Sequence, residues 1–114
     1  MNKEYNEYNK LIRDNVPELI NKNHPGKDVV FFQHPDNRDF EIELLKKVDE
    51  ELNEYLQTTE QQQKMEELAD VFEVFMTILD FNGFTFQDIE EMRMRKKEVR
   101  GGFEKRLYLI KVEK

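Results

Sequence analysis

The sequence predicts a mostly α-helical fold, namely an antiparallel helix bundle with a small two-stranded β-ribbon, over a single domain of residues 1–114. Apolar residues recur at three- and four-residue intervals through the middle of the chain, which is the period of a buried helix face. Short connectors separate these stretches, and short connectors make neighbouring helices antiparallel. Nine Phe and four Tyr supply enough apolar surface for one small core.

The first expected helix runs from about Asp14 to Lys22. Asp14 can cap it, and Pro17 falls in its first turn, where the missing N–H costs little. The His-Pro-Gly sequence at 24–26 then ends it. The segment from Val29 to Gln33 is β-branched and aromatic, which is the composition of a short strand.

Two longer helices are expected next, from about Asn37 to Gln57 and from about Glu60 to Phe81. The inward positions of the first are Phe40, Leu44, Leu45, Val48, Leu52, Tyr55 and Leu56. Those of the second are Met65, Leu68, Val71, Phe72, Phe75, Ile78 and Leu79. Asn82-Gly83 is a strong stop signal after the second helix.

Thr85 is expected to cap a last helix, with Asp88 in its first turn and an end near Arg100. The two glycines at 101–102 end it. The following segment, 103–112, alternates partly between polar and apolar residues. We expect it to pair with 29–33 as the second strand of the ribbon.

The charge of the chain limits the classes of partner. With 25 acidic and 18 basic residues the net charge is −7, so binding to a nucleic acid polymer is not expected. Cysteine is absent, which excludes disulfides and thiolate metal sites and favours a cytoplasmic protein. Neither a signal peptide nor a membrane span is expected from the pattern of apolar residues. A small domain so rich in charge often completes its core by self-association, and we expect a homo-oligomer.

Two pairs of acids have the spacing of one helix face: Glu51 with Glu54, and Glu67 with Asp70. On a helical wheel each pair lies about 80° to the same side of its own apolar stripe. On two antiparallel helices the pairs must either converge over the shared groove or diverge. Four converging carboxylates would require a hard divalent cation such as Mg²⁺, with Mn²⁺ as a substitute. The alternative is that both helices carry acids on solvated faces.

Three motifs in the chain resemble a known group of enzymes. ELNE at 51–54 and ELAD at 67–70 resemble the E-x-x-E … E-x-x-D signature of MazG-like and phosphoribosyl-ATP pyrophosphohydrolase-like proteins, the all-α nucleoside triphosphate pyrophosphatase superfamily. The opening YNKLIRDNVPE at 8–18 is similar to the N-K-L-V-R-D-K-I-P-E opening of one small branch. The segment RGGFEKRLYL at 100–109 is similar to the R-G-G-F-x-K-R ending of that branch.

This resemblance implies antiparallel helices, often in dimers or tetramers, that hydrolyse a nucleoside triphosphate between the α and β phosphates. The products would be a monophosphate and pyrophosphate, with a house-cleaning role on non-standard nucleotides. It also implies Mg²⁺ ligation by the four acids Glu51, Glu54, Glu67 and Asp70. We assign Glu54 as the base that accepts the proton of the attacking water. The Lys of the R-D-K-I-P motif is Asn15 here, which removes one possible phosphate contact.

Six cations are candidates for binding a nucleotide substrate: Lys10, Arg13, Lys47, Arg95, Lys96 and Arg100. Arg forks match phosphate oxygens well. Lys47 can instead form an ion pair with Glu51 one turn later, and the others can belong to solvated or structural surfaces. Two rival functions remain open: a non-catalytic helical dimerisation module, and a pyrophosphohydrolase that acts on a phosphoribosyl-nucleotide.

Overall fold

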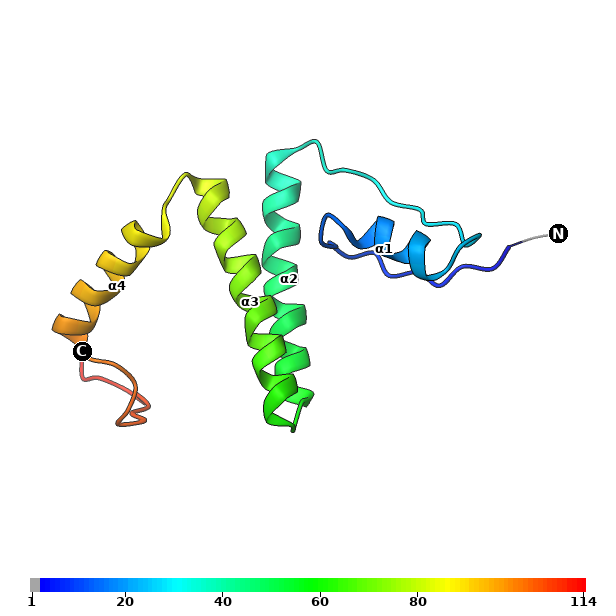
Figure 1. Cartoon of the computed structure of the whole chain (residues 1–114). Coiled ribbons are helices and arrows are strands. Elements are labelled where there is room, and N and C mark those ends of the chain that lie inside the picture. The colour runs from blue at the N-terminus through cyan, green and yellow to red at the C-terminus, as the bar shows by residue number, and fades with distance from the viewer. Residues whose placement is uncertain (1–2) are drawn as a thin grey trace. The chain divides into compact units, whose positions relative to one another are not determined.

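The computed structural model describes residues 3–114 and is helical, which confirms the predicted mostly α fold (Figure 1). The helices are α1 (Val16–Asn23), α2 (Asn37–Gln57), α3 (Gln61–Asn82) and α4 (Phe86–Arg100). Contacts divide the chain into two compact units, Met1–Ile78 and Leu79–Lys114, and each is described by itself below. The single domain stays a prediction.

The short helix α1 begins at Val16, one residue later than a cap at Asp14 would place its first residue. Its N-cap is Asn15 rather than Asp14, and no side chain caps it. Pro17 does lie in the first turn, where its fixed φ suits the helix. The helix ends at Asn23, and the backbone N–H of His24 donates to the carbonyl oxygen of Ile20 at 2.8 Å.

The helices α2 and α3 lie side by side and antiparallel, as a helical hairpin (Figure 1). The Asp36 carboxylate caps α2 by accepting from the backbone N–H groups of Arg38 and Asp39, at 2.8 and 3.1 Å. The connector between the helices spans only residues 58–60, and this length dictates the antiparallel arrangement. Within this unit Leu44 of α2 and Val74 of α3 are buried, with 2% and 9% of their surface exposed.

In the second unit, α4 has a complete capping box. The Thr85 hydroxyl accepts from the backbone N–H of Asp88 at 3.1 Å, and the Asp88 carboxylate accepts from the backbone N–H of Thr85 at 2.9 Å. At the other end Gly101 has φ +79°, a left-handed value that favours glycine, and its N–H donates to the carbonyl of Lys97. Both predicted ends of this helix are therefore confirmed.

We expect Thr85→Ala to lower the free energy of unfolding by about 1 kcal/mol, because it leaves orphan N–H groups at the start of α4. Urea denaturation monitored by circular dichroism measures this. The matched control is Thr59→Ala, since Thr59 is an exposed threonine in the α2–α3 connector. An equal loss in both variants would contradict a specific role for the cap.

The predicted β-ribbon is wrong: within residues 3–114 neither 29–33 nor 103–112 forms a strand. Most side chains of both segments are exposed, including Val30 at 83% and Phe103 at 95%. A two-stranded ribbon is marginal in water unless another element covers its apolar face. The β-branched and aromatic composition of these segments is therefore not sufficient to form a sheet.

Among the described helices, none combines the length and the apolar character that a membrane span requires.

Candidate metal centre

Three carboxylates from α2 and α3 converge. Glu51 and Glu54 of α2 and Glu67 of α3 each offer an oxygen atom, and these atoms lie within 4.8 Å of one another. The three differ in exposure: Glu51 is buried, Glu67 is half-buried and Glu54 is exposed. Of the two arrangements that the sequence allowed, convergence or divergence, the structure has convergence for these three residues.

Two oxygens in this cluster are buried and have no hydrogen-bond donor among residues 3–114. They are Oε2 of Glu51 and Oε2 of Glu67. Both oxygen atoms are themselves buried, and only 6% of the surface of Glu51 is exposed. Burying a carboxylate oxygen without a partner is costly, because it loses its hydration and gains nothing in return. A positively charged ligand is the simplest compensation for both oxygens.

The protonation of Glu51 reflects the same crowding. Burial raises the pKa of Glu51 above its ordinary value, and the neighbouring carboxylate of Glu54 raises it further. Lys47 acts in the opposite direction, and the more distant Asp70 adds to the rise. The raised pKa shows that the folded chain holds negative charge at Glu51 at a cost in free energy.

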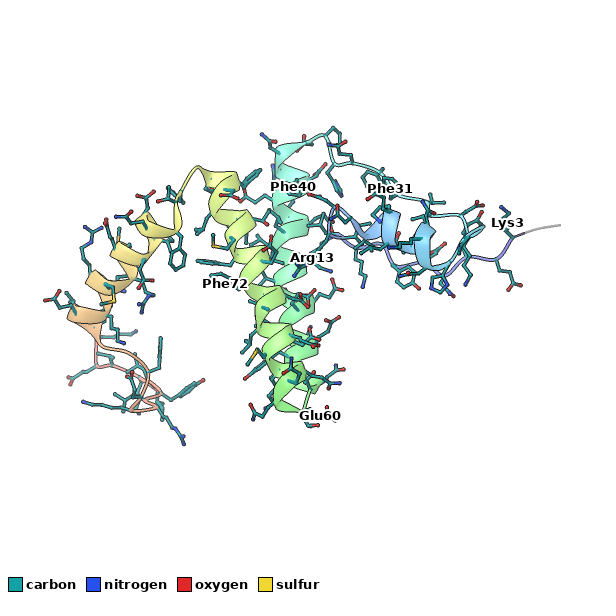
Figure 2. The ribbon with its side chains drawn as sticks, in the orientation of Figure 1. Lys3, Arg13, Phe31, Phe40, Glu60 and Phe72 are labelled. Carbon is teal, nitrogen blue, oxygen red and sulfur yellow. The ribbon has the colours of Figure 1, made fainter. Side chains whose placement is uncertain are left out.

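The fourth predicted ligand, Asp70, has a different partner. Its Oδ1 accepts from the Nη2 of Arg13 at 2.6 Å, so Arg13 ties the N-terminal segment to α3 (Figure 2). Asp70 is not one of the three acids whose oxygens converge within 4.8 Å. The structure therefore places Asp70 beside the cluster, with its charge compensated by a partly exposed guanidinium.

Lys47 and Lys10 form ion pairs with acids in and beside the cluster. The Nζ of Lys47 lies 3.0 Å from Oε2 of Glu50 and 3.4 Å from Oε1 of Glu51, and Lys10 lies 3.2 Å from Oε1 of Glu50. Burial works to raise the pKa of Glu50, but the two lysines outweigh it and the pKa is lowered. Glu50 was not among the predicted site residues, although its place four residues before Glu54 on an acidic helix was a usable signal.

We expect Lys47→Met to lower the stability of the metal-free protein by about 2 kcal/mol, because Glu50 and Glu51 lose their shared cation in a partly buried place. Added Mg²⁺ should restore much of this loss. The control is Lys46→Met, since Lys46 is 68% exposed and forms its ion pair with Glu43, outside the cluster. Thermal unfolding with and without Mg²⁺ tests this; unchanged stability together with a raised KM would instead assign Lys47 to substrate binding.

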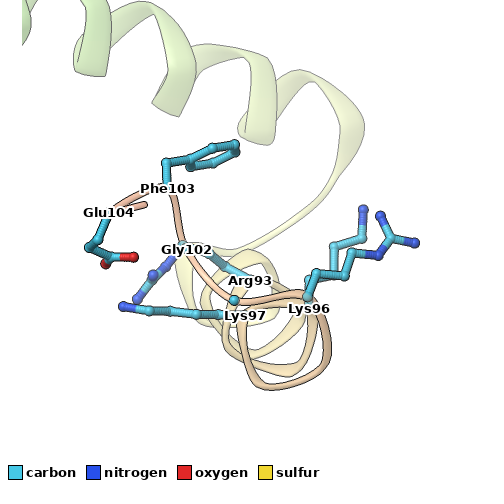
Figure 3. A pocket seen from close by; sticks show the side chains of 8 residues that line it. Arg93, Lys96, Lys97, Gly102, Phe103 and Glu104 are labelled. Carbon is cyan, nitrogen blue, oxygen red and sulfur yellow. The ribbon is translucent and has the colours of Figure 1, made fainter. Parts of the chain in front are cut away.

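The other predicted cations lie in the second unit and divide between two hollows on α4. Lys96 and Arg100 line one, together with Arg93 and Lys97, which were not among the predicted site residues (Figure 3). Arg95 lines the other, with Phe84 and Met92 among its neighbours. At 100° per residue, Arg95 falls on another side of α4 from the other four cations, so it lines a different hollow.

No family model matches the chain, and no curated protein or solved structure matches it either. The interpretation of the cluster therefore depends on its own chemistry. Its donor atoms are all carboxylate oxygens, which are the ligands that hard divalent cations prefer. The donor set and the two orphaned oxygens together fit Mg²⁺, and Mn²⁺ as a substitute.

Proposed function

We propose that the chain is a Mg²⁺-dependent nucleoside triphosphate pyrophosphohydrolase that cleaves the α–β phosphoanhydride. The observation that carries this proposal is the convergence of three carboxylates with two buried, unpartnered oxygens between α2 and α3. Mg²⁺ seldom occupies an all-protein cage, and takes water and phosphate oxygens as its remaining ligands. Three carboxylates with an exposed member suit a metal that also binds a phosphorylated substrate. The type of reaction is inferred from the sequence motifs, which resemble those of the all-α pyrophosphatase superfamily.

In this proposal Glu51 and Glu67 hold the metal, because their orphaned oxygens gain most from a cation. Bound Mg²⁺ would neutralise phosphate charge and polarise the phosphorus that water attacks. Glu54 is the exposed member of the cluster, so it can both reach the metal and accept a proton from an incoming water. Asp70 completes the set either as a ligand that releases Arg13 or as the residue that positions this arginine.

The candidate cations of the same unit differ in their exposure and in the partners that they already have, and therefore in how readily they could bind the substrate. Arg13 is 59% exposed while bound to Asp70, so it can turn to a phosphate oxygen at little cost. Lys47 is only 14% exposed and already serves two carboxylates, which favours a structural role. Lys10 lies between these extremes. We propose a cytoplasmic, house-cleaning role on non-standard nucleotides, with the enzyme working as a dimer or tetramer.

Product analysis tests the reaction directly. The wild-type protein with Mg²⁺ is incubated with standard and modified nucleoside triphosphates and with a phosphoribosyl-nucleotide, in water enriched in ¹⁸O, and followed by phosphorus NMR. We expect a monophosphate and pyrophosphate, and no turnover in EDTA. Each cleavage should add one ¹⁸O to only one product: to the monophosphate if water attacks the α phosphorus, or to pyrophosphate if it attacks the β phosphorus. Orthophosphate as the first product would contradict α–β cleavage, and turnover of the phosphoribosyl-nucleotide alone would establish that rival.

A helical association module is the second candidate, and the exposed apolar surface of the hairpin favours it. Leu45, Leu56 and Met65 are 55%, 76% and 65% exposed. Calorimetric titration separates the candidates: an oligomer that binds neither Mg²⁺ nor Mn²⁺ would support the module and refute the enzyme.

A further inference from the structure

A second feature with chemical potential lies at the end of α4. Arg93, Lys96, Lys97 and Arg100 follow the spacing i, i+3, i+4, i+7, which places all four on one face of the helix. They line a hollow of about 710 Å³, together with Phe103 and with the glycines that end the helix (Figure 3). All of these residues belong to the unit Leu79–Lys114, so the hollow is complete without the carboxylate cluster.

The charge of this hollow remains positive after its compensating groups are counted. Arg93 forms an ion pair with Glu90, the Glu104 carboxylate also lines the hollow, and the end of α4 contributes about half a negative charge. Four cations against these groups leave about +1.5 elementary charges. Complementing the helix dipole needs only one cation, so it does not account for the whole group. An anion therefore finds a net attraction here, in a chain whose net charge is −7.

The hollow also offers a flat apolar surface. Phe103 lines it, and 95% of its surface is exposed, so its ring has open faces. In Figure 3 the side chains of Arg93 and Lys97 extend to one side of the hollow, and Lys96 extends to the other. A Cβ at Gly101 would meet nothing within 4 Å, which leaves the backbone there open to a ligand. Cations beside an uncovered aromatic ring suit a ligand that joins phosphates to a planar base.

We propose that this hollow is a nucleotide-binding site in which the cations hold the phosphates and Phe103 stacks on the base. The proposal deepens the proposed function and rests on it for the class of ligand, while the binding itself needs no metal. A nucleic acid polymer is disfavoured, because the unit has only two more basic than acidic residues, nine against seven, and the rest of the chain is strongly acidic.

The test uses the full chain in EDTA, so that the carboxylate cluster holds no metal. Calorimetric titration is done with ATP and with inorganic tripolyphosphate, at about 20 mM salt where screening is weak. Tripolyphosphate reports binding by the cations alone, and ATP reports binding by the cations and Phe103 together. Lys97→Gln with Arg100→Gln keeps good helix formers in α4; we expect it to weaken ATP binding about tenfold. Phe103→Ala should weaken ATP binding about fivefold and leave tripolyphosphate binding unchanged.

The matched control is Lys111→Gln with Lys114→Gln, which removes the same charge from the tail beyond the hollow. ATP binding within twofold of the wild type in this control supports a defined site, and an equal loss in both double variants would overturn it. Absence of ATP binding to the wild type, or tighter binding of a single-stranded RNA oligomer than of ATP, would also overturn it. ATP binding without any turnover in Mg²⁺ would refute only the pyrophosphohydrolase.

Discussion

Glu51→Gln is expected to abolish Mg²⁺-dependent turnover and to weaken Mn²⁺ binding by about 100-fold or more, because it removes a charged oxygen donor from the most buried residue of the cluster. The same change should stabilise the metal-free protein by about 1 kcal/mol, since a buried, unpartnered carboxylate oxygen is replaced by an amide that can donate to its neighbours. Lys47 keeps its closer partner, Glu50, at 3.0 Å. Loss of function and gain of stability in a single variant is a combination that a purely structural glutamate would not give.

Calorimetry with Mn²⁺ and urea denaturation in EDTA measure the two effects. The control is Asp49→Asn, which removes one negative charge from an exposed position on the same helix. It should change neither quantity by more than about 0.5 kcal/mol. Metal binding that survives Glu51→Gln, or a metal-free protein that becomes less stable, would refute the assignment of Glu51. It would then not be a metal ligand whose buried charge lowers the stability of the metal-free protein.

The pH dependence of the stability of the metal-free protein also tests whether the charge of Glu51 is unfavourable in the folded chain. The pKa of Glu51 is higher in the folded than in the unfolded chain, so the folded chain binds more protons at this group. Its contribution to stability is therefore present below the ordinary value of 4.5 and is lost as the pH rises through the raised, folded value. We expect wild type to lose stability relative to Glu51→Gln over that interval. A difference that is constant with pH would contradict the raised pKa.

Leu44→Ala is expected to lower the free energy of unfolding by about 3 kcal/mol and the Tm by about 15 °C, because it opens a cavity in a small core. Leu44 is 2% exposed and is one of only a few fully buried apolar side chains among the described residues. The loss is thus a large part of the stability of a domain of this size.

Leu56→Ala is the matched control, since Leu56 lies on the same helix and is 76% exposed. Its effect should stay within about 0.5 kcal/mol. Thermal unfolding in EDTA compares the two variants. A similar loss at both positions would mean that Leu56 is covered in solution, and would contradict a core confined to the side of Leu44.

Local chemistry made the helices predictable. α2 begins and ends at the predicted residues, Asn37 and Gln57, because the apolar period and the Asp36 cap act over a few residues. Thr85 and Gly101 set the ends of α4 for the same reason. The ribbon was not predictable in this way, since strand pairing requires a partner far along the chain and a cover for its apolar face.

The candidate site was likewise predictable where it depends on residues close in the sequence, and not where it depends on packing between distant segments. Residues three apart on one helix share a face, so the pairing of Glu51 with Glu54 follows from their spacing. Their approach to Glu67 depends on how α3 packs on α2, and the sequence left convergence and divergence open. That Arg13 binds Asp70 depends on the path of a segment more than fifty residues away, for which spacing gives no signal.

The orphaned oxygens of Glu51 and Glu67 have a consequence for the folding equilibrium itself. A cation that binds them in the folded chain, and not in the unfolded chain, stabilises the fold by RT ln(1 + [M]/Kd). Above the Kd, each tenfold rise in free metal would add about 1.4 kcal/mol. With so small an apolar core, the fraction of folded chain would then follow the free Mg²⁺ of its surroundings.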